Sequence, residues 1–421
     1  MRTVRAAVWI GVWIAAGALA VGCGPGAPVA DDPTGSESAT PSTSESGAAS
    51  PTPTGTSPVG CPPGSTPYLP GAADQARPGA SAWFQLAAMA PAEPAIVVGE
   101  SGLVPVGAGM WSLQSMWVFD VCTNSWQERG ASSLPAPNER PALGQFVSHE
   151  GAGLVLGLPV GLAPVWSYES LDDQWTQLSS TGGGGEAWPF AVYDPDGDRL
   201  LAFEAHNSTV KSYDLAADAW SVVDSAESAD SSSARPNARM DQVDLAYDSA
   251  EHLLILVITP SGALEESAET WAFDPDSGTW SRRADVPNTL ELGYPSGWAA
   301  AFDPSGGRTW LFAETAMLAY DARADSWTVA ERGPGWPAPT MVGDVEVDPV
   351  ARLVDTMVVD PINERLVVIG GLVRRAGDPV GGFEFENSTL PTDDVWAYDP
   401  ATNTWTLLLP ASDNPASLGP G

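Results

Sequence analysis

Positively charged residues are scarce in this chain. Only 18 of its 421 residues are lysine or arginine, against 53 aspartates and glutamates, and Lys211 is the single lysine. The net charge of −35 at pH 7 repels phosphates and anionic lipid head groups. We therefore expect no nucleic-acid partner, and the acidic balance is typical of a protein that stays soluble outside the cell.

Histidine and cysteine are also rare, with three of each. The sequence contains no zinc-ligand spacing, phosphate-binding loop or nucleophile elbow. Asp194, Asp196 and Asp198 alternate as in a calcium loop, but no glycine follows Asp198 and no glutamate closes the loop, so we interpret them as a hairpin turn. The sequence therefore predicts no metal, no cofactor and no catalytic residue.

Long apolar runs are missing as well, with one exception near the start. Arg2 and Arg5 precede an apolar stretch over residues 6–20, and Ala-Val-Gly leads into Cys23. The pattern is typical of an export signal and is marginal in length for a membrane span. Its end resembles a bacterial lipobox, which implies a signal peptide over residues 1–22 and a lipid on Cys23. The protein would then be anchored on the extracytoplasmic side of the cell membrane; secretion after a plain signal is the alternative.

The segment after Cys23 predicts a tether. Residues 24–58 are rich in Ser, Thr, Pro, Gly and Ala and contain no Lys or Arg. Such a segment buries too little surface to offset the entropy cost of ordering. We therefore predict a disordered tether over residues 23–60, lipidated cysteine included, and a flexible tail over residues 414–421.

The remaining cysteines, Cys61 and Cys122, suggest one disulfide in an exported chain. The bond would close a loop of about sixty residues and stabilise the fold by about 4 kcal/mol on the chain-entropy model. Because Cys122 lies in the first repeat described below, the bond would tie the entering segment to that repeat. Two free thiols or a metal site are the weaker alternatives, since no histidine lies near either cysteine.

An aromatic–acid pair followed by a tryptophan, seven positions after the aromatic residue, occurs six times. The aromatic residues and their tryptophans are Phe119/Trp126, Tyr168/Trp175, Tyr213/Trp220, Phe273/Trp280, Tyr320/Trp327 and Tyr398/Trp405. The residues before each acid alternate as in a strand, and the acid begins a turn. Two residues before each tryptophan only Asn, Asp or Gly occurs, which indicates a left-handed backbone there. Each segment is therefore predicted to be a β-hairpin.

A second hairpin precedes this one in most repeats. Its turn begins at Asp194, Asp248, Asp303 or Asp360, and an arginine follows five residues later in three of the four cases, as Arg199, Arg308 and Arg365. We expect these arginines to pair with a turn carboxylate. Less regular versions lie near residues 88–98 and 147–156.

Two hairpins make a four-stranded sheet, and six such units of about 55 residues are typical of propeller blades. The chain here resembles the kelch family, with the best match in DVWAYDPATNTWTLL (residues 394–408) and a double glycine at Gly370-Gly371. The resemblance implies an all-β, six-bladed kelch-like β-propeller over residues 61–413, within the galactose-oxidase-like superfamily. The expected blades are residues 80–130, 131–179, 180–224, 225–284, 285–331 and 332–410.

Variation in loop length predicts the working face. With strands A to D counted from the axis outward, the A–B and C–D turns lie on one face and keep constant lengths, whereas the B–C and D–A connections on the other face vary. Loops on a rigid scaffold commonly carry function. The predicted binding residues on the variable face are Arg140, Trp188, His206, Arg235, Arg239, Tyr294, Trp298, Trp336, Arg352, Arg374, Arg375 and Glu386. Alternatively, the tryptophans wedge between blades and the arginines cap the channel.

Catalysis is the less favoured interpretation. The galactose-oxidase type implied by the resemblance needs two tyrosines, two histidines and a cysteine crosslink around copper. His149 and His252 fall in A–B turns, and only His206 falls in a B–C loop. We therefore expect a monomeric, membrane-anchored module that binds a protein or a glycan through its B–C/D–A face. A carbohydrate-active enzyme of the cell envelope (mutarotase, lyase or oxidase) and a scaffold for an envelope complex are the alternatives.

Overall fold

The computed structural model describes residues 61, 84–88, 95–103, 111–129, 143–149, 154–159, 164–169, 172–178, 190–205, 207–224, 235–236, 242–259, 268–287, 298–313, 316–330, 336, 341–342, 345–354, 356–375 and 389–411. Within these ranges all regular secondary structure is β-strand. The predicted signal peptide, the tail and Cys23 lie outside the described residues.

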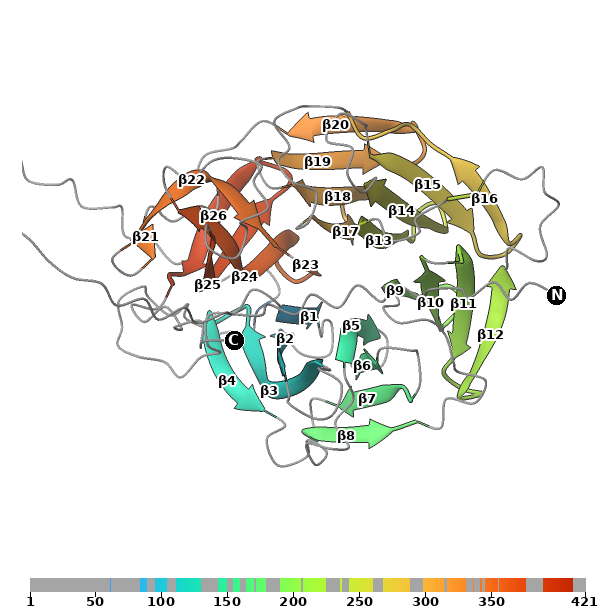
Figure 1. The fold of residues 1–421 in the computed structure, drawn as a ribbon, viewed down its shortest axis with the longest axis horizontal. Helices are drawn as coiled ribbons and strands as arrows, with labels where there is room; N and C mark the ends of the chain where they lie inside the picture. The colour runs from blue at the N-terminus through green and yellow to red at the C-terminus, as the bar shows by residue number, and fades with distance from the viewer. Residues whose placement is uncertain are drawn as a thin grey trace, which may run out of the picture. The chain divides into compact units, whose positions relative to one another are not determined.

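The strands form six antiparallel sheets in chain order (Figure 1). The first contains β1 (Phe84–Ala88), β2 (Ala95–Leu103), β3 (Trp111–Asp120) and β4 (Ser125–Arg129), and the second β5 (Leu143–His149), β6 (Leu154–Pro159), β7 (Trp166–Glu169) and β8 (Gln174–Gln177). The third contains β9 (Phe190–Asp194), β10 (Arg199–Glu204), β11 (Thr209–Asp214) and β12 (Ala219–Asp224), and the fourth β13 (Gln242–Asp248), β14 (Leu253–Thr259), β15 (Glu269–Asp274) and β16 (Thr279–Arg282). The fifth contains β17 (Ala299–Asp303), β18 (Arg308–Ala313), β19 (Ala316–Asp321) and β20 (Ser326–Ala330).

The sixth sheet is larger. Its blade core is β23 (Met357–Asp360), β24 (Arg365–Arg375), β25 (Thr389–Asp399) and β26 (Thr404–Leu409). A hairpin of β21 (Met341–Val342) and β22 (Val345–Leu353) adds to it, because β23 pairs with the first half of β24 and β22 with the second half. Five four-stranded sheets and one enlarged sheet therefore follow one another along the chain.

The six sheets close into a ring through their innermost strands. β1 contacts β5, β5 contacts β9, β9 contacts β13, β13 contacts β17, β17 contacts β23, and β23 contacts β1. Between the second and third sheets the amide side chain of Gln145 bonds both the N–H and the C=O of Ala191, at 2.6 and 2.8 Å. This closed circuit of radial sheets is the β-propeller expected from the repeat.

The C–D turns have the predicted geometry. In all six, the aromatic residue and the tryptophan are cross-strand partners whose ring centroids lie 4.9–5.2 Å apart. The residue two before each tryptophan has a φ between 48° and 66°, namely Asn124, Asp173, Asp218, Gly278, Asp325 and Asn403. The five aspartates at the start of these turns accept backbone N–H groups of their own turn; Asp120, for example, bonds Cys122 and Thr123 at 2.8 and 2.9 Å. The acids are turn formers, as predicted.

The A–B turns repeat the same chemistry closer to the axis. Asp194 accepts the N–H groups of Asp196 and Gly197, and its second oxygen accepts Arg199 at 2.7 Å. Asp360 and Arg365 form the equivalent pair at 2.9 Å. The predicted pairing of these arginines with a turn carboxylate is confirmed.

Arg308 differs from the other two arginines. It approaches the C–D acid Asp321, at 3.9 Å, instead of the acid of its own turn. This arginine too lies beside a turn carboxylate, although on the neighbouring hairpin.

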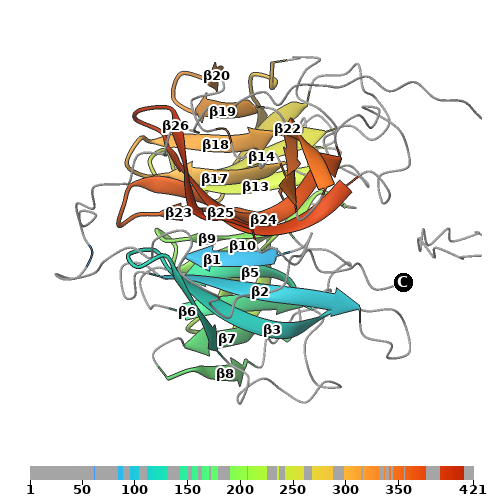
Figure 2. The same cartoon turned by 90° about the vertical axis from the view of Figure 1, so that its left-hand side faces the viewer.

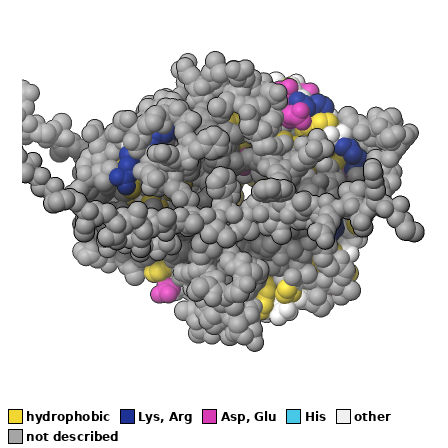
Figure 3. Space-filling view, viewed as in Figure 1, with side chains coloured by type: hydrophobic (Ala, Val, Ile, Leu, Met, Phe, Trp, Pro, Cys, Tyr) yellow, Lys and Arg dark blue, Asp and Glu magenta, His cyan; other side chains and the backbone are white. Residues whose placement is uncertain are grey.

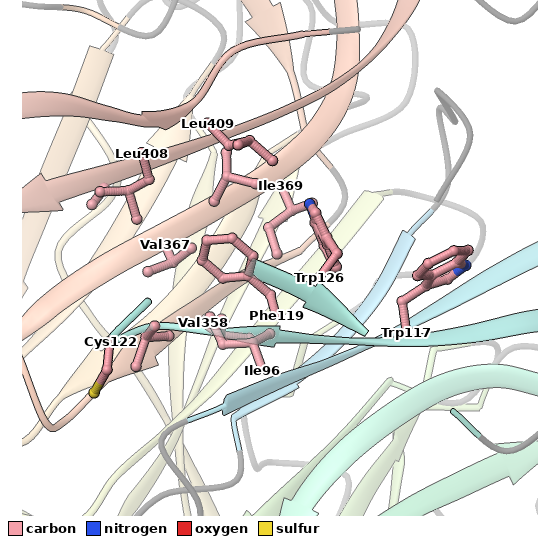
Figure 4. Close-up of a cluster of buried hydrophobic side chains, with 13 residues drawn as sticks. Ile96, Trp117, Phe119, Cys122, Trp126, Val358, Val367, Ile369, Leu408 and Leu409 are labelled. Atoms are coloured by element: carbon pink, nitrogen blue, oxygen red, sulfur yellow. The ribbon is translucent and has the colours of Figure 1, made fainter. Parts of the chain in front are cut away.

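Apolar side chains fill the spaces between neighbouring sheets. Leu201 and Phe203 of the third sheet share one cluster with Leu254, Leu256 and Phe273 of the fourth. Similar clusters join the fifth and sixth sheets and the sixth and first sheets, and the latter is drawn in Figure 4. The core is therefore divided among the seams of the ring.

Candidate interaction face

The two faces of the ring differ in loop length, as the sequence predicted. Four residues lie between strands in every C–D turn and in all A–B turns except the first. The B–C connections range from two residues, between β18 and β19, to thirteen, between β24 and β25. Length variation is therefore concentrated on the B–C/D–A face.

Two neighbouring sheets extend their B–C hairpins furthest. β24 and β25 have eleven residues each, and β2 and β3 have nine and ten, whereas the other B and C strands have four to seven. In the side view of Figure 2, β2 and β24 both extend to the right. Because β1 contacts β23, these long hairpins belong to adjacent blades.

The extension of the sixth sheet has a small core of its own. Val347 of β22, Val373 of β24 and Leu390 of β25 form a separate buried cluster. Beyond it β24 ends with Arg374, which is half-buried, and Arg375, which is exposed. The three strands therefore form a packed platform that ends in basic side chains.

The predicted binding residue Arg352 lies inside this sheet. Its guanidinium is fully buried, forms an ion pair with the buried Asp394, and donates to the carbonyl of Gly370 at 3.0 Å. Asp394 also accepts the hydroxyl of Thr392 at 2.9 Å and the indole N–H of Trp396 at 2.6 Å. These contacts of Arg352 are internal to the sixth sheet, and its side chain has no exposed surface for a ligand.

Two predicted tryptophans have similar internal positions. Trp298 is 5% exposed and packs with residues of the fourth and fifth sheets, such as Val257 and Leu311. Trp336 stacks on Phe312 and meets Trp405 edge-on, with ring centroids 5.5 and 5.8 Å apart. Both tryptophans act as wedges between blades, which is the alternative that the sequence left open.

Arg235 also serves an inter-blade contact. It bonds both carboxylate oxygens of Asp224, at the end of β12. Asp224 in turn accepts the indole N–H of Trp280 from the fourth sheet at 2.9 Å. Of the predicted binding residues that the structure describes, Arg374 and Arg375 are therefore the two on the extended hairpin. Six further predicted binding residues lie outside the described residues: Arg140, Trp188, His206, Arg239, Tyr294 and Glu386.

Two histidines on the opposite face contact one turn of the third sheet. His149 stacks on Tyr193 and lies 3.1 Å from Asp198, and His252 lies 2.8 Å from Asp196. The hydroxyls of Tyr193 and Tyr247 bond the same two carboxylates, at 2.8 and 3.0 Å. Sequence analysis missed these contacts, because they join residues of three different repeats.

These contacts account for the calcium-like alternation of acids in that turn. Asp194 is bonded by its own turn and Arg199, Asp196 by the fourth sheet, and Asp198 by Tyr193 and the second sheet. The segment is a hairpin turn, as the sequence analysis interpreted it. Across the described ranges, no three His, Cys, Asp or Glu side chains are grouped as a metal site.

Among the described residues, Figure 3 shows no gathering of basic side chains on the face in view, and no helix could span a membrane. The lysine and arginine side chains visible in Figure 3 are scattered and do not gather in one area. In the portion that the structure describes, no helix has the length and apolarity that a membrane span requires.

Comparison with known proteins agrees with this geometry. Residues 358–408, which include most of the sixth blade, match the Kelch motif family. No curated protein matches the chain. Together with the ring of sheets, the motif supports a kelch-type β-propeller whose sixth blade carries a kelch motif, a fold that commonly serves as a protein-interaction module.

Similar solved structures are distant. The crystal structure of a protein from Lactobacillus plantarum has 14% identity and a TM-score of 0.43, with 76% of this chain and 82% of that chain covered. A chain in the crystal structure of a nidogen/laminin complex has 12% identity and a TM-score of 0.37, with 58% and 78% covered. At these values neither similarity carries an argument about function.

Proposed function

We propose that this propeller is an extracytoplasmic interaction module that binds a protein partner through its B–C/D–A face. One observation carries the proposal: the longest B–C hairpins, β2–β3 and β24–β25, belong to adjacent blades and extend from the same face. Turns on the opposite face have four residues in every case but the first A–B turn, and some of them form ion pairs between blades. A rigid ring with irregular loops on one side resembles other scaffolds that present binding loops.

The platform of β22, β24 and β25 is the proposed centre of contact. Its buried cluster of Val347, Val373 and Leu390 holds the extension rigid, so that little ordering entropy is lost on binding. Arg375 is exposed at its end, in a chain with few basic residues. Arginine is enriched at protein interfaces and pairs with carboxylates in two-pronged geometry.

Site-specific crosslinking tests the proposal. A photo-reactive residue at position 375 of the full chain, in the cells that produce it, should form an adduct with one protein of fixed mass. The same group at Asp276, which is 90% exposed on the opposite face, should not. Excess purified full-length protein should reduce formation of the adduct by competing for the partner, and its Arg375→Glu variant should compete less well. Equal adducts from both positions would contradict the proposal, and retention of a glycan on an array without any protein adduct would favour a carbohydrate ligand.

We further propose that Cys23 anchors the module to the membrane through a lipid. The positive start, apolar stretch and terminal cysteine of the first 23 residues support this placement. A Cys23→Ser variant should move from the membrane fraction to the soluble fraction, and metabolic labelling with a fatty-acid analogue should be lost. Release of the unaltered protein into the medium would instead indicate a plain secretory signal.

A further inference from the structure

One seam of the ring, between the sixth and first sheets, joins two sheets that are not consecutive in the chain. Neighbouring sheets from the first to the sixth follow one another along the chain, so that the outer strand of one leads to the inner strand of the next, with the β21–β22 hairpin inserted before β23. The sixth and first sheets are the exception, because β26 and β1 are far apart in the chain. Each described sheet is built from its own consecutive strands, so no strand is exchanged across this seam.

The C–D turn of the first sheet fills the seam. Val121 and Cys122 are 3% and 1% exposed and share a cluster with Val358 and Val367 of the sixth sheet (Figure 4). Trp126 lies in the same cluster. At the preceding seam Trp405, at the same position of the sixth sheet, likewise lies in the apolar cluster that the fifth and sixth sheets share.

A polar contact repeats the pattern found at other seams. Arg323, in the C–D turn of the fifth sheet, pairs with Glu251 in the A–B turn of the fourth at 2.7 Å. At the closing seam Arg365, in the A–B turn region of the sixth sheet, donates to the carbonyl of Val121 in the C–D turn of the first at 3.0 Å. The ring therefore closes by the same turn-to-turn contact that joins consecutive blades.

The disulfide lies at this contact. Cys61 is bonded to Cys122, which directly follows Val121, and it packs with Ile362 against the cluster that spans the seam. We propose that the Cys61–Cys122 disulfide locks the closing seam of the propeller, so that its reduction loosens the first and sixth sheets before any others. The bond holds the entering segment at Cys61 against the C–D turn of the first sheet, where Cys61 packs on the apolar cluster shared by the first and sixth sheets.

The redox step is a two-electron exchange with an external dithiol. A thiolate of the dithiol attacks the Sγ of Cys61, which is partly exposed, whereas Cys122 is buried. The Sγ–Sγ bond breaks, Cys122 leaves as a thiolate and takes a proton, and the second thiol of the reagent releases Cys61. The protein gains two thiols and the reagent becomes a cyclic disulfide.

Hydrogen exchange of the full chain, followed by peptide, tests the proposal. Treatment with dithiothreitol should speed amide exchange in β1–β4 and β23–β26 by at least about ten-fold, while exchange in β13–β16 changes by less than about two-fold. The Cys61→Ser variant, which keeps the Cys122 side chain in the core, should show the same regional pattern without reductant. Equal acceleration in all six sheets, or none, would overturn the proposal.

Two arginine variants supply the matched control and a second measurement if Cys61→Ser does not fold. Arg365→Gln should speed exchange at the closing seam in the oxidised protein, and reduction should then add to the effect. Arg323→Gln should speed exchange in the fourth and fifth sheets and leave the response of the first and sixth sheets to dithiothreitol unchanged. If Arg323→Gln altered that response as much as Arg365→Gln did, the disulfide would not be specific to the closing seam.

Discussion

The hydroxyl of Tyr320 donates a hydrogen bond of 2.8 Å to the carboxylate of Asp325, five residues further along the same turn. Asp325 has a φ of 48°, and its carboxylate also accepts the N–H of Ala284 from the neighbouring sheet at 2.8 Å. The pair thus fixes a turn and joins two blades. In the fourth sheet the same positions hold Phe273 and Gly278, so that turn lacks both the hydroxyl and the side-chain acceptor, whereas the first sheet has Phe119 with Asn124.

The hydrogen bond predicts a measurable coupling between Tyr320 and Asp325. Tyr320→Phe should lower the free energy of unfolding by about 1 kcal/mol, because Asp325 loses the hydroxyl donor and keeps only the N–H of Ala284 among these two bonds. Asp325→Gly should cost energy as well, although glycine adopts the positive φ without strain. The double variant, which recreates the pair of the fourth sheet, should be more stable than the sum of the two losses predicts, by about 1 kcal/mol. Urea unfolding of the four proteins measures the difference.

The fourth sheet provides the reciprocal control. Phe273→Tyr places a hydroxyl opposite Gly278, which has no side chain to accept it, so this variant should lose stability. Phe273→Tyr combined with Gly278→Asp should recover part of the loss. Strict additivity in both cycles would contradict the coupling.

Buried tyrosines predict a loss of stability in alkaline solution. Burial and the charge of Asp399 raise the pKa of Tyr398 to about 12, and burial together with the bond to Asp325 raises the pKa of Tyr320 further. An unfolded tyrosine titrates near pH 10. Because the folded pKa values are the higher ones, these groups stabilise the fold fully below about pH 10, and the contribution is lost as the pH rises through the folded values. Unfolding monitored by tyrosinate absorbance should show this dependence, and Tyr320→Phe should make it shallower.

The turns could be predicted from sequence because their determinants are local. The residues before the tryptophans are Asn, Asp or Gly for a backbone reason, and the structure has a positive φ at all six. Arg199 and Arg365 lie five residues from the acids they bond, across a single hairpin. The recurrence of the aromatic–acid–tryptophan segment along the chain then allowed the ring of sheets to be predicted.

Contacts between blades could not be predicted in this way. Nothing in one repeat indicates that His252 reaches Asp196, 56 residues earlier, or that Arg365 reaches Val121. The placement of Arg352 shows the same limit: the sequence put it on the variable face, but whether its guanidinium points to solvent or to Asp394 depends on the pairing of β22 with β24. Such contacts depend on the geometry of the whole ring.

The fourth sheet lacks the arginine that pairs with the A–B turn acid in the third and sixth sheets. Arg199 and Arg365 pair with the turn acids five residues before them. In the fourth sheet the residue at this position is Leu253. Its acid, Asp248, is 1% exposed, and its Oδ2 has no hydrogen-bond partner among the described residues. Burial raises the pKa of Asp248, and the N–H groups of Glu251 and Ala250 only partly oppose this. The ionised carboxylate therefore costs stability at neutral pH.

Leu253→Arg should supply the missing partner. Leu253→Gln is the matched control, because it removes the same apolar packing without adding a charge. At pH 7 the arginine variant should be more stable than the glutamine variant by about 1–2 kcal/mol. Since the folded pKa of Asp248 is raised, its penalty appears as the pH rises through that value. The difference between the variants should therefore shrink in acid, and a pH-independent difference would contradict pairing with Asp248.

Variants of the buried ion pair between Arg352 and Asp394 can distinguish a structural role of Arg352 from a binding role. Arg352→Met should destabilise the protein by about 3–5 kcal/mol, because it leaves the Asp394 carboxylate buried without its cation. Arg352→Met combined with Asp394→Asn removes both charges and keeps an acceptor for Thr392 and Trp396, so it should recover part of the stability. Urea unfolding measures both changes, and crosslinking from position 375 in the double variant measures partner binding. Because Arg352 has no exposed surface, the adduct should persist wherever the fold persists. Full stability of Arg352→Met together with loss of the adduct would instead make Arg352 a contact residue.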